Sequence, residues 1–130
     1  MKLGVCVPYR NREEHMKVFI PHVSNFLDKM GIEHTIYLAH QCDEKLFNRG
    51  LMKNIAAKYA FDDGCDYIVW HDIDMVPEDE SCDYSYNPDS PKHLAVRISQ
   101  SDSPYRTKVC PRFNILFGIS NNFNIPTSCT

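Results

Sequence analysis

Apolar residues in the first part of the chain form short runs that alternate with longer segments of helical periodicity. The runs at residues 2–7 and 66–71 are largely apolar, as in buried strands, and residues 33–40 alternate weakly, as a third strand would. Between these runs, apolar side chains recur at helical spacing over residues 13–30 and over residues 48–61, where an asparagine can cap the segment. The sequence therefore predicts the order strand, helix, strand, helix, strand. The run at 66–71 is the most hydrophobic, so we expect it at the centre of the sheet.

Proline and glycine set the expected limits of these elements. Pro8 should close the first strand, and Gly31 should end the first helix in a left-handed cap. Pro21 removes a backbone donor, so it should kink or break that helix, and two short helices fit the pattern equally well. The apolar stripes expected to face the core are Met16, Phe19, Ile20, Val23, Phe26, Leu27 and Met30 in the first helix, and Leu51, Met52, Ile55, Ala56 and Tyr59 in the second.

The second half of the chain has a weaker pattern. Residues 78–91 are rich in Asp, Ser, Asn and Pro and predict a loop. Residues 94–98 and 114–119 can each add a strand, and the polar residues at the end of the chain are expected to fray.

Length and composition fit one domain. The chain has 130 residues, 43% of them hydrophobic, which is enough for a single core of ordinary size. Its formal charge of -3 and its scattered lysines and arginines give no electrostatic basis for nucleic-acid binding, although a local arginine pair can still bind a phosphate. No apolar run reaches membrane-spanning or signal-peptide length, so the chain as given is expected to be soluble and cytoplasmic. The six cysteines include no Cys-x-x-Cys pair, and without an export signal we expect free thiols.

Polar residues after the strands are the first candidates for a site. The predicted alternation favours a parallel sheet with right-handed crossovers, whose ligands bind beyond the carboxyl ends of the strands. Directly after the first strand comes the sequence Pro8-Tyr9-Arg10-Asn11-Arg12. Two guanidinium groups beside a helix N-terminus can bind a diphosphate or a nucleotide base. The alternative is a solvated loop whose arginines pair with Glu13 and Glu14.

A second cluster, Phe47-Asn48-Arg49-Gly50, lies at the start of the second predicted helix and so at the same edge of the sheet. Phe47 can stack on a base, and Arg49 can contact a phosphate or a ribose. The alternative is that Asn48 caps the helix and Phe47 is buried, and both interpretations can hold together.

A third cluster, Asp72-Ile73-Asp74, ends the central strand. Residues two apart in an extended chain project the same way, so both carboxylates can face one ligand. Mg²⁺ and Mn²⁺ take oxygen ligands octahedrally and often combine one or two carboxylates with substrate phosphates. Two isolated acids at a strand end are usually only solvated, but the apolar run before them and the Met-Val-Pro-Glu sequence after them make the pattern more specific.

These clusters resemble three successive motifs of the β-1,4-galactosyltransferase family, in order and at similar separations. The matching stretches are Val7-Pro8-Tyr9-Arg10-Asn11-Arg12-Glu13-Glu14-His15, Phe47-Asn48-Arg49-Gly50 and His71-Asp72-Ile73-Asp74-Met75-Val76-Pro77-Glu78. Two further segments, His93-Leu94-Ala95-Val96 and Phe117-Gly118-Ile119-Ser120, resemble later parts of the family. We therefore expect residues 1–120 to form a glycosyltransferase donor-binding domain, with residues 121–130 as an unassigned tail.

The resemblance implies a GT-A type α/β fold, with a mainly parallel sheet flanked by helices and truncated at its C-terminal side. It implies a UDP-sugar, usually UDP-galactose, as donor, Mn²⁺ or Mg²⁺ as cofactor, and inverting transfer to a carbohydrate acceptor. By this similarity residues 8–12 would hold the uridine and diphosphate, and residues 47–49 would complete the nucleotide pocket. Asp72 would lie near the donor sugar and ribose, and Asp74 would bind the metal.

The resemblance leaves the activity open. The family places its catalytic base and further metal ligands in a later motif, which does not occur before Thr130, and the segment at 117–120 has one glycine where members usually carry two. An active hexosyltransferase, a non-catalytic nucleotide-binding remnant and an unrelated interaction protein all remain possible. Relatives are commonly anchored in the Golgi, and a sheet cut short would be expected to self-associate or to be marginally stable.

Overall fold

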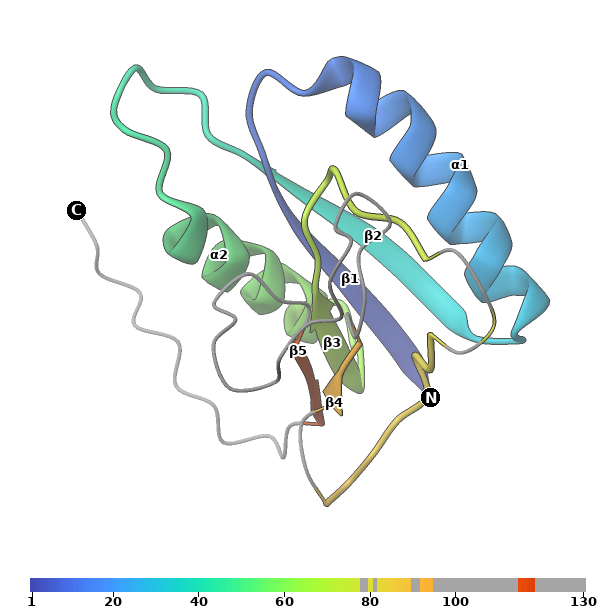
Figure 1. Ribbon diagram of the computed structural model, residues 1–130. Helices are drawn as coiled ribbons and strands as arrows, with labels where there is room; N and C mark the ends of the chain where they lie inside the picture. The colour runs from blue at the N-terminus through green and yellow to red at the C-terminus, as the bar shows by residue number, and fades with distance from the viewer. Residues whose placement is uncertain (78–79, 81, 90–91, 95–114, 119–130) are drawn as a thin grey trace.

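The computed structural model describes residues 1–77, 80, 82–89, 92–94 and 115–118 as a twisted sheet with helices on both faces (Figure 1). Glu78, residues 95–98 of one predicted strand, the segment at 119–130, Cys110 and Cys129 lie outside this part of the chain. The elements are β1 (Lys2–Tyr9), α1 (Glu13–Lys29), β2 (Glu33–His40), α2 (Arg49–Asp62), β3 (Tyr67–Trp70), β4 (Lys92–His93) and β5 (Ile115–Gly118).

The strand order is β2-β1-β3-β5-β4, so the most hydrophobic run, β3, is central as predicted. β1 pairs in parallel with both β2 and β3, whereas β5 is antiparallel to β3 and β4 is antiparallel to β5. The predicted strand, helix, strand, helix, strand order is confirmed. The first crossover, through α1, connects β1 to β2 on one side of it, and the second, through α2, connects β2 to β3 on the other side of β1. The strand order therefore reverses at β1, and sheets of this kind bind ligands at the carboxyl ends of the strands beside the reversal, here β1 and β3.

β1 continues through Pro8, so the expectation that this proline closes the strand is wrong. The carbonyl of Cys6 accepts a hydrogen bond of 2.9 Å from the amide of His71, which shows that Cys6 faces β3. Pro8 is two residues further on and faces the same side, where β3 has already ended at Trp70. The missing N–H therefore faces no strand in the described sheet, and proline is tolerated under that condition.

α1 is one continuous helix with Pro21 inside it, so of the alternatives for Pro21, a kink or a break into two short helices, the break is wrong. Pro21 lies on the exposed side, where water can satisfy the carbonyl of Lys17 that loses its helical partner. The predicted glycine cap is confirmed. Gly31 has a φ of 71°, and the amide of Ile32 donates to the carbonyl of Leu27 over 3.0 Å.

The two faces of the sheet carry separate apolar cores. Phe19, Val23 and Leu27 of α1 are buried on one face, while Ile20 and Met30 stay 37% exposed, so the buried stripe is narrower than predicted. The core residues on the α1 face are Leu3, Val5, Val7, Tyr9, Phe19, Val23, Leu27, Tyr67, Val69, Ile73 and Tyr84. Those on the α2 face are Cys6, Ala56, Ala57, Ala60, Cys65 and Ile68.

α2 approaches the sheet through small residues, which shifts its buried face from the predicted one. Ala57 and Ala60 are buried, whereas Tyr59 is 62% exposed and Ile55 also lies on the exposed side. A Cβ atom added to Gly4 of β1 would lie only 2.7 Å from the Cβ of Ala60. The close contact between helix and strand therefore requires small side chains on both, and Ile55 and Tyr59 face outward although Met52 is buried.

Two further expectations concern the chain as a whole. Cys6, Cys42, Cys65 and Cys82 are free thiols, as predicted for the cysteines that the structure describes. Within the same residues, neither helix has the length and apolar character needed to cross a bilayer.

Candidate functional site

A pocket of about 300 Å³ lies at the carboxyl ends of β1 and β3. This volume is at the lower end of the range of about 300–1,000 Å³ that is usual for small-molecule sites. Three chain segments meet there: the turn after β1, the start of α2 and the turn after β3. The lining residues are Pro8, Arg10, Asn11, Arg12, Phe47, Arg49, Asp72, Ile73 and Asp74.

Two of the predicted site residues, Tyr9 and Asn48, do not line the pocket. Tyr9 is buried in the core on the α1 face, where its ring meets that of His40 edge-on with 5.1 Å between centroids. Asn48 is the N-cap of α2, because its side-chain oxygen accepts a hydrogen bond of 3.0 Å from the amide of Leu51. The other predicted residues line the cavity.

The turn after β1 directs its arginines into the pocket. Asn11 has a φ of 52°, in the left-handed region that asparagine tolerates better than most residues, and this reverses the chain before α1. Arg10 donates to the carbonyl of Lys45 over 2.6 Å, and its guanidinium lies 5.3 Å from the centre of the Phe47 ring. Within the described residues, Glu13 and Glu14 form no ion pair with these arginines, so the pairing that the solvated-loop alternative expects is not found, although residues 11–15 are exposed.

The loop between β2 and α2 is held by Gln41, which the sequence analysis missed. Its buried side-chain nitrogen donates to the Asp43 carboxylate over 2.8 Å and to the Leu46 carbonyl over 3.0 Å. Its side-chain oxygen accepts from the amide of Asn48 over 2.8 Å. The bond from Gln41 lowers the pKa of Asp43. A glutamine directly after a strand, with both a donor and an acceptor, is the only sequence signal for this role.

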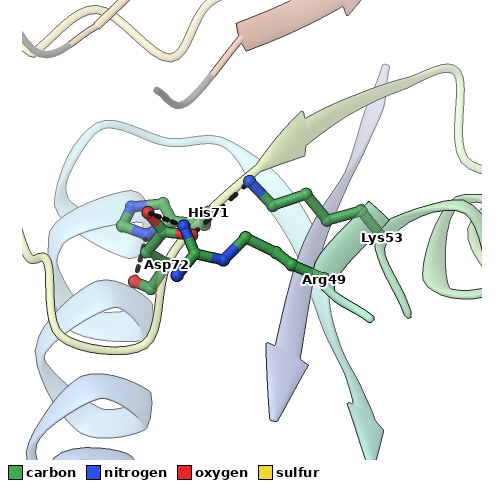
Figure 2. Close-up of polar contacts among 4 residues, drawn as sticks. All are labelled: Arg49, Lys53, His71 and Asp72. Carbon is green, nitrogen blue, oxygen red and sulfur yellow. Dashed lines mark hydrogen bonds and ion pairs between the residues drawn. The ribbon is translucent and has the colours of Figure 1, made fainter. Parts of the chain in front are cut away.

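The two aspartates of the third cluster have different surroundings (Figure 2). Asp72 lies between two cations of α2, with 3.4 Å from its Oδ1 to the Lys53 Nζ and 4.0 Å from its Oδ2 to Arg49 Nη1. Asp74 is exposed and has no ion pair with any described residue. The Asp-x-Asp sequence therefore presents one carboxylate that is already neutralised and one that is open to a ligand.

His71 fixes the main chain at the first aspartate. Its Nδ1–H donates to the Asp72 carbonyl over 3.0 Å, so its Nε2 accepts from the hydroxyl of Tyr84, 2.9 Å away. Both side chains are buried, and the Phe19 ring packs edge-on against the imidazole at 4.9 Å. Burial lowers the pKa of His71 to about 4, so the ring is neutral near pH 7. Periodicity alone did not single out His71 or Tyr84.

The described residues suit a divalent cation only if a ligand helps to hold it. They contain no group of three or more His, Cys, Asp or Glu side chains that could hold an ion. Asp74 supplies one accessible carboxylate beside three arginines that line the same cavity. A hard cation such as Mn²⁺ or Mg²⁺ fits this arrangement when phosphate oxygens complete its coordination.

The sheet order and the pocket at the carboxyl edge define a GT-A type nucleotide-sugar glycosyltransferase fold. The N-terminal region of glycosyl transferase group 7 matches residues 1–87, and the chain belongs to this family, that of the β-1,4-galactosyltransferases. The chain is 38% identical to β-1,4-galactosyltransferase 7 of Mus musculus over an alignment of 129 residues, gaps included, that covers 94% of this chain and 39% of the mouse protein. It is 32% identical to β-1,4-galactosyltransferase 4 of Cricetulus griseus over 120 residues, which are 92% of this chain and 34% of the hamster protein. The chain thus spans well under half the length of these relatives.

Solved structures show the same fold. A crystal structure of a mutant Drosophila β-1,4-galactosyltransferase 7 in complex with manganese, UDP-Gal and xylobiose matches with a TM-score of 0.69 and 36% identity, over 72% of this chain and 40% of that one. The catalytic domain of the Drosophila enzyme in complex with xylobiose matches with a TM-score of 0.66 and 35% identity, over 69% of this chain and 38% of that one.

Proposed function

We propose that the pocket binds UDP-galactose together with Mn²⁺ and that it serves as the donor side of an inverting transfer to a carbohydrate acceptor. The observation that carries this proposal is the meeting of Arg10, Arg12 and Arg49 with Asp72 and Asp74 in one cavity at the sheet edge. Cationic and anionic groups in one small cavity match a diphosphate held through a metal ion. The complex of a similar Drosophila protein with manganese, UDP-Gal and xylobiose supports the choice of ligands.

The diphosphate and the base of the donor, and the cation, each have a counterpart in the pocket. The guanidinium groups of Arg12 and Arg49 contact the diphosphate, and the half-exposed ring of Phe47 offers a face to the uracil. Arg10 lies over the same ring, so its guanidinium and the base would both contact the Phe47 ring. Asp74 would hold the cation, which would supply positive charge near the leaving diphosphate.

The described residues account for binding and for departure of the leaving group. In the proposed reaction an acceptor hydroxyl oxygen forms a bond to the anomeric carbon while the bond from that carbon to the UDP oxygen breaks. The proton of the hydroxyl passes to a carboxylate base, and no described residue is assigned that role. The electrons of the broken bond go to UDP, whose new negative charge is balanced by the arginines lining the pocket.

Calorimetric titration of the purified chain with UDP, in Mn²⁺ and in a chelator, tests the cation part of the proposal. We expect strong mutual dependence, with UDP bound at least about tenfold more weakly in the chelator, because one carboxylate alone holds a hard cation poorly. Asp74→Asn should remove this dependence. Asp62→Asn is the matched control, because Asp62 is an exposed carboxylate paired with Lys58 at the far end of α2. Equal UDP affinity under both conditions would refute the role of the cation.

Turnover is tested separately with UDP-galactose and a xylose-containing acceptor. Release of UDP that Asp74→Asn abolishes is the expected result for an active transferase. Metal-dependent UDP binding without turnover favours the alternative, a non-catalytic nucleotide-binding domain. A folded chain that binds no UDP in either condition would overturn the donor site itself.

A further inference from the structure

We propose that Lys53 is a built-in cation of the donor site, which neutralises Asp72 and thereby leaves the divalent metal to Asp74. Lys53 does not line the cavity and is a positioning residue, because it acts through the carboxylate that it contacts. The inference rests on the proposed binding of UDP with a divalent cation. It adds a residue to the site for which the sequence pattern gave no signal.

The geometry of α2 brings two cations to one carboxylate. Arg49 and Lys53 are four residues apart on the helix, so their side chains leave from the same face. Figure 2 shows both side chains extending to Asp72, which follows β3. The Lys53 Nζ lies 3.4 Å from one carboxylate oxygen, and Arg49 Nη1 lies 4.0 Å from the other. Each oxygen of Asp72 therefore has its own positive neighbour.

Burial makes the lysine contact the stronger of the two. The side chains of Lys53 and Asp72 are only 15% and 12% exposed, whereas that of Arg49 is 53% exposed. The Oδ1 atom of Asp72 is buried and accepts no hydrogen bond from any described residue. A buried carboxylate oxygen without hydrogen bonds needs a nearby opposite charge, and water screens this pair little. The ammonium of Lys53 supplies that charge.

A neutralised Asp72 is a poor ligand for a divalent cation. A metal ion approaching its oxygens would meet an ammonium and a guanidinium at short distance, and like charges repel strongly in a shielded site. Asp74 has no such neighbour among the described residues and lies on the exposed rim. Lys53 thus assigns the two aspartates different tasks. Asp74 takes the metal, and Asp72 keeps an oriented carboxylate for hydroxyl groups of the donor.

Lys53→Met separates this electrostatic role from simple structural support. The substitution keeps a long apolar stem but removes the charge, so the pocket becomes more negative and Asp72 becomes available to the metal. We expect Mn²⁺ binding without nucleotide to tighten by about tenfold, as measured from the free Mn²⁺ signal in electron paramagnetic resonance. UDP binding in chelator should weaken by a similar factor, as measured by calorimetry. Loss of folding alone would weaken both.

Three further variants complete the experiment. Lys53→Arg keeps the charge and should leave both affinities within about twofold of the wild type. Lys58→Met is the matched control, since Lys58 lies on the same helix, is half-exposed and pairs with Asp62. The double variant Lys53→Met with Asp72→Asn removes both charges. It should return Mn²⁺ affinity to the wild-type value, and it keeps the test readable if Lys53→Met alone does not fold.

The outcomes distinguish this inference from the proposed function. If the wild type binds UDP with Mn²⁺ but Lys53→Met leaves nucleotide-free Mn²⁺ affinity unchanged or weaker, the role of Lys53 is refuted and the donor site stands. If the folded wild type binds neither UDP nor Mn²⁺, the donor site itself is refuted. Opposite shifts of the two affinities in Lys53→Met, absent in Lys58→Met, are the supporting result.

Discussion

Acidification from pH 8 to pH 5 is predicted to destabilise the fold through His71. The imidazole is 1% exposed, and both of its nitrogens are engaged in the neutral form. Nδ1–H donates to the Asp72 carbonyl, and Nε2 accepts from the Tyr84 hydroxyl. A proton added to Nε2 converts this acceptor into a donor, places a charge in the core and forces the Tyr84 hydroxyl to turn. Burial accordingly lowers the pKa of His71 to about 4.

The size of the effect follows from the two pKa values. The unfolded chain binds a proton at this histidine near pH 6.5, whereas the folded chain does so only near pH 4. The unfolded state therefore gains protons first as the pH falls. The stabilisation is complete above about pH 6.5 and is lost between there and about pH 4. At about 1.4 kcal/mol for each unit of pKa difference, the full loss is about 3 kcal/mol, with about 2 kcal/mol lost by pH 5. Such a loss is large for a fold stabilised by about 5–15 kcal/mol in total.

Urea unfolding across this pH range gives the measurement, with His71→Gln as the test variant. Glutamine retains a donor and an acceptor but does not titrate. Between pH 8 and pH 5 the unfolding free energy of His71→Gln should therefore fall by about 2 kcal/mol less than that of the wild type. His15→Gln, at an exposed position of α1, is the matched control. If His71→Gln does not fold, the imidazole signals of the wild type can be followed by NMR. A folded-state titration of His71 near pH 6.5 would refute the reasoning.

Two substitutions test the supports of the pocket and of the sheet. Gln41→Met leaves the Asn48 amide and the Leu46 carbonyl without their partner. We therefore expect UDP affinity to fall about tenfold in calorimetry, and the free energy of unfolding to fall by about 1–3 kcal/mol in urea unfolding. Unchanged UDP affinity would contradict the role of Gln41 in presenting the loop. Gly4→Ala places a Cβ 2.7 Å from that of Ala60 and should cost about 1–3 kcal/mol in urea unfolding. Adding Ala60→Gly should restore part of the loss, and no rescue would argue against this contact.

Hydrophobic spacing predicted the elements that position the site. β2 was found at the predicted residues, and α2 begins after its predicted Asn48 cap. The rule that ligands bind at the carboxyl edge of such a sheet then predicted that three distant clusters lie together. In the structure the arginine turn, Arg49 and the aspartates line one pocket. These parts of the site depend on the parallel direction of β1, β2 and β3 and on the central place of β3. The pattern of apolar and polar residues predicted these two features, but it did not predict the full strand order.

The errors arose where the prediction depended on how closely two elements approach. Pro8 was expected to end β1, because the residues around it do not show that the neighbouring strand β3 ends before it reaches the level of Pro8. Gln41, His71 and Tyr84 were missed because their hydrogen bonds join segments whose separation no periodicity encodes. Tyr84 lies in a region predicted only as an acidic loop, yet it is one of the most buried side chains that the structure describes.

The orientation of α2 explains both why its buried face differs from the predicted one and why no sequence signal pointed to Lys53. A hydrophobicity pattern favours burial of Ile55 and Tyr59, but the contact with Gly4 admits only the alanine face of the helix. Lys53 lies three residues before Ala56 and therefore shares that inward face. The helix orientation that packs the alanines against β1 thus also places the Lys53 ammonium at the end of β3, beside Asp72. A larger residue at position 4 would turn or lift the helix, so packing at the sheet centre and charge balance at its edge depend on the same glycine.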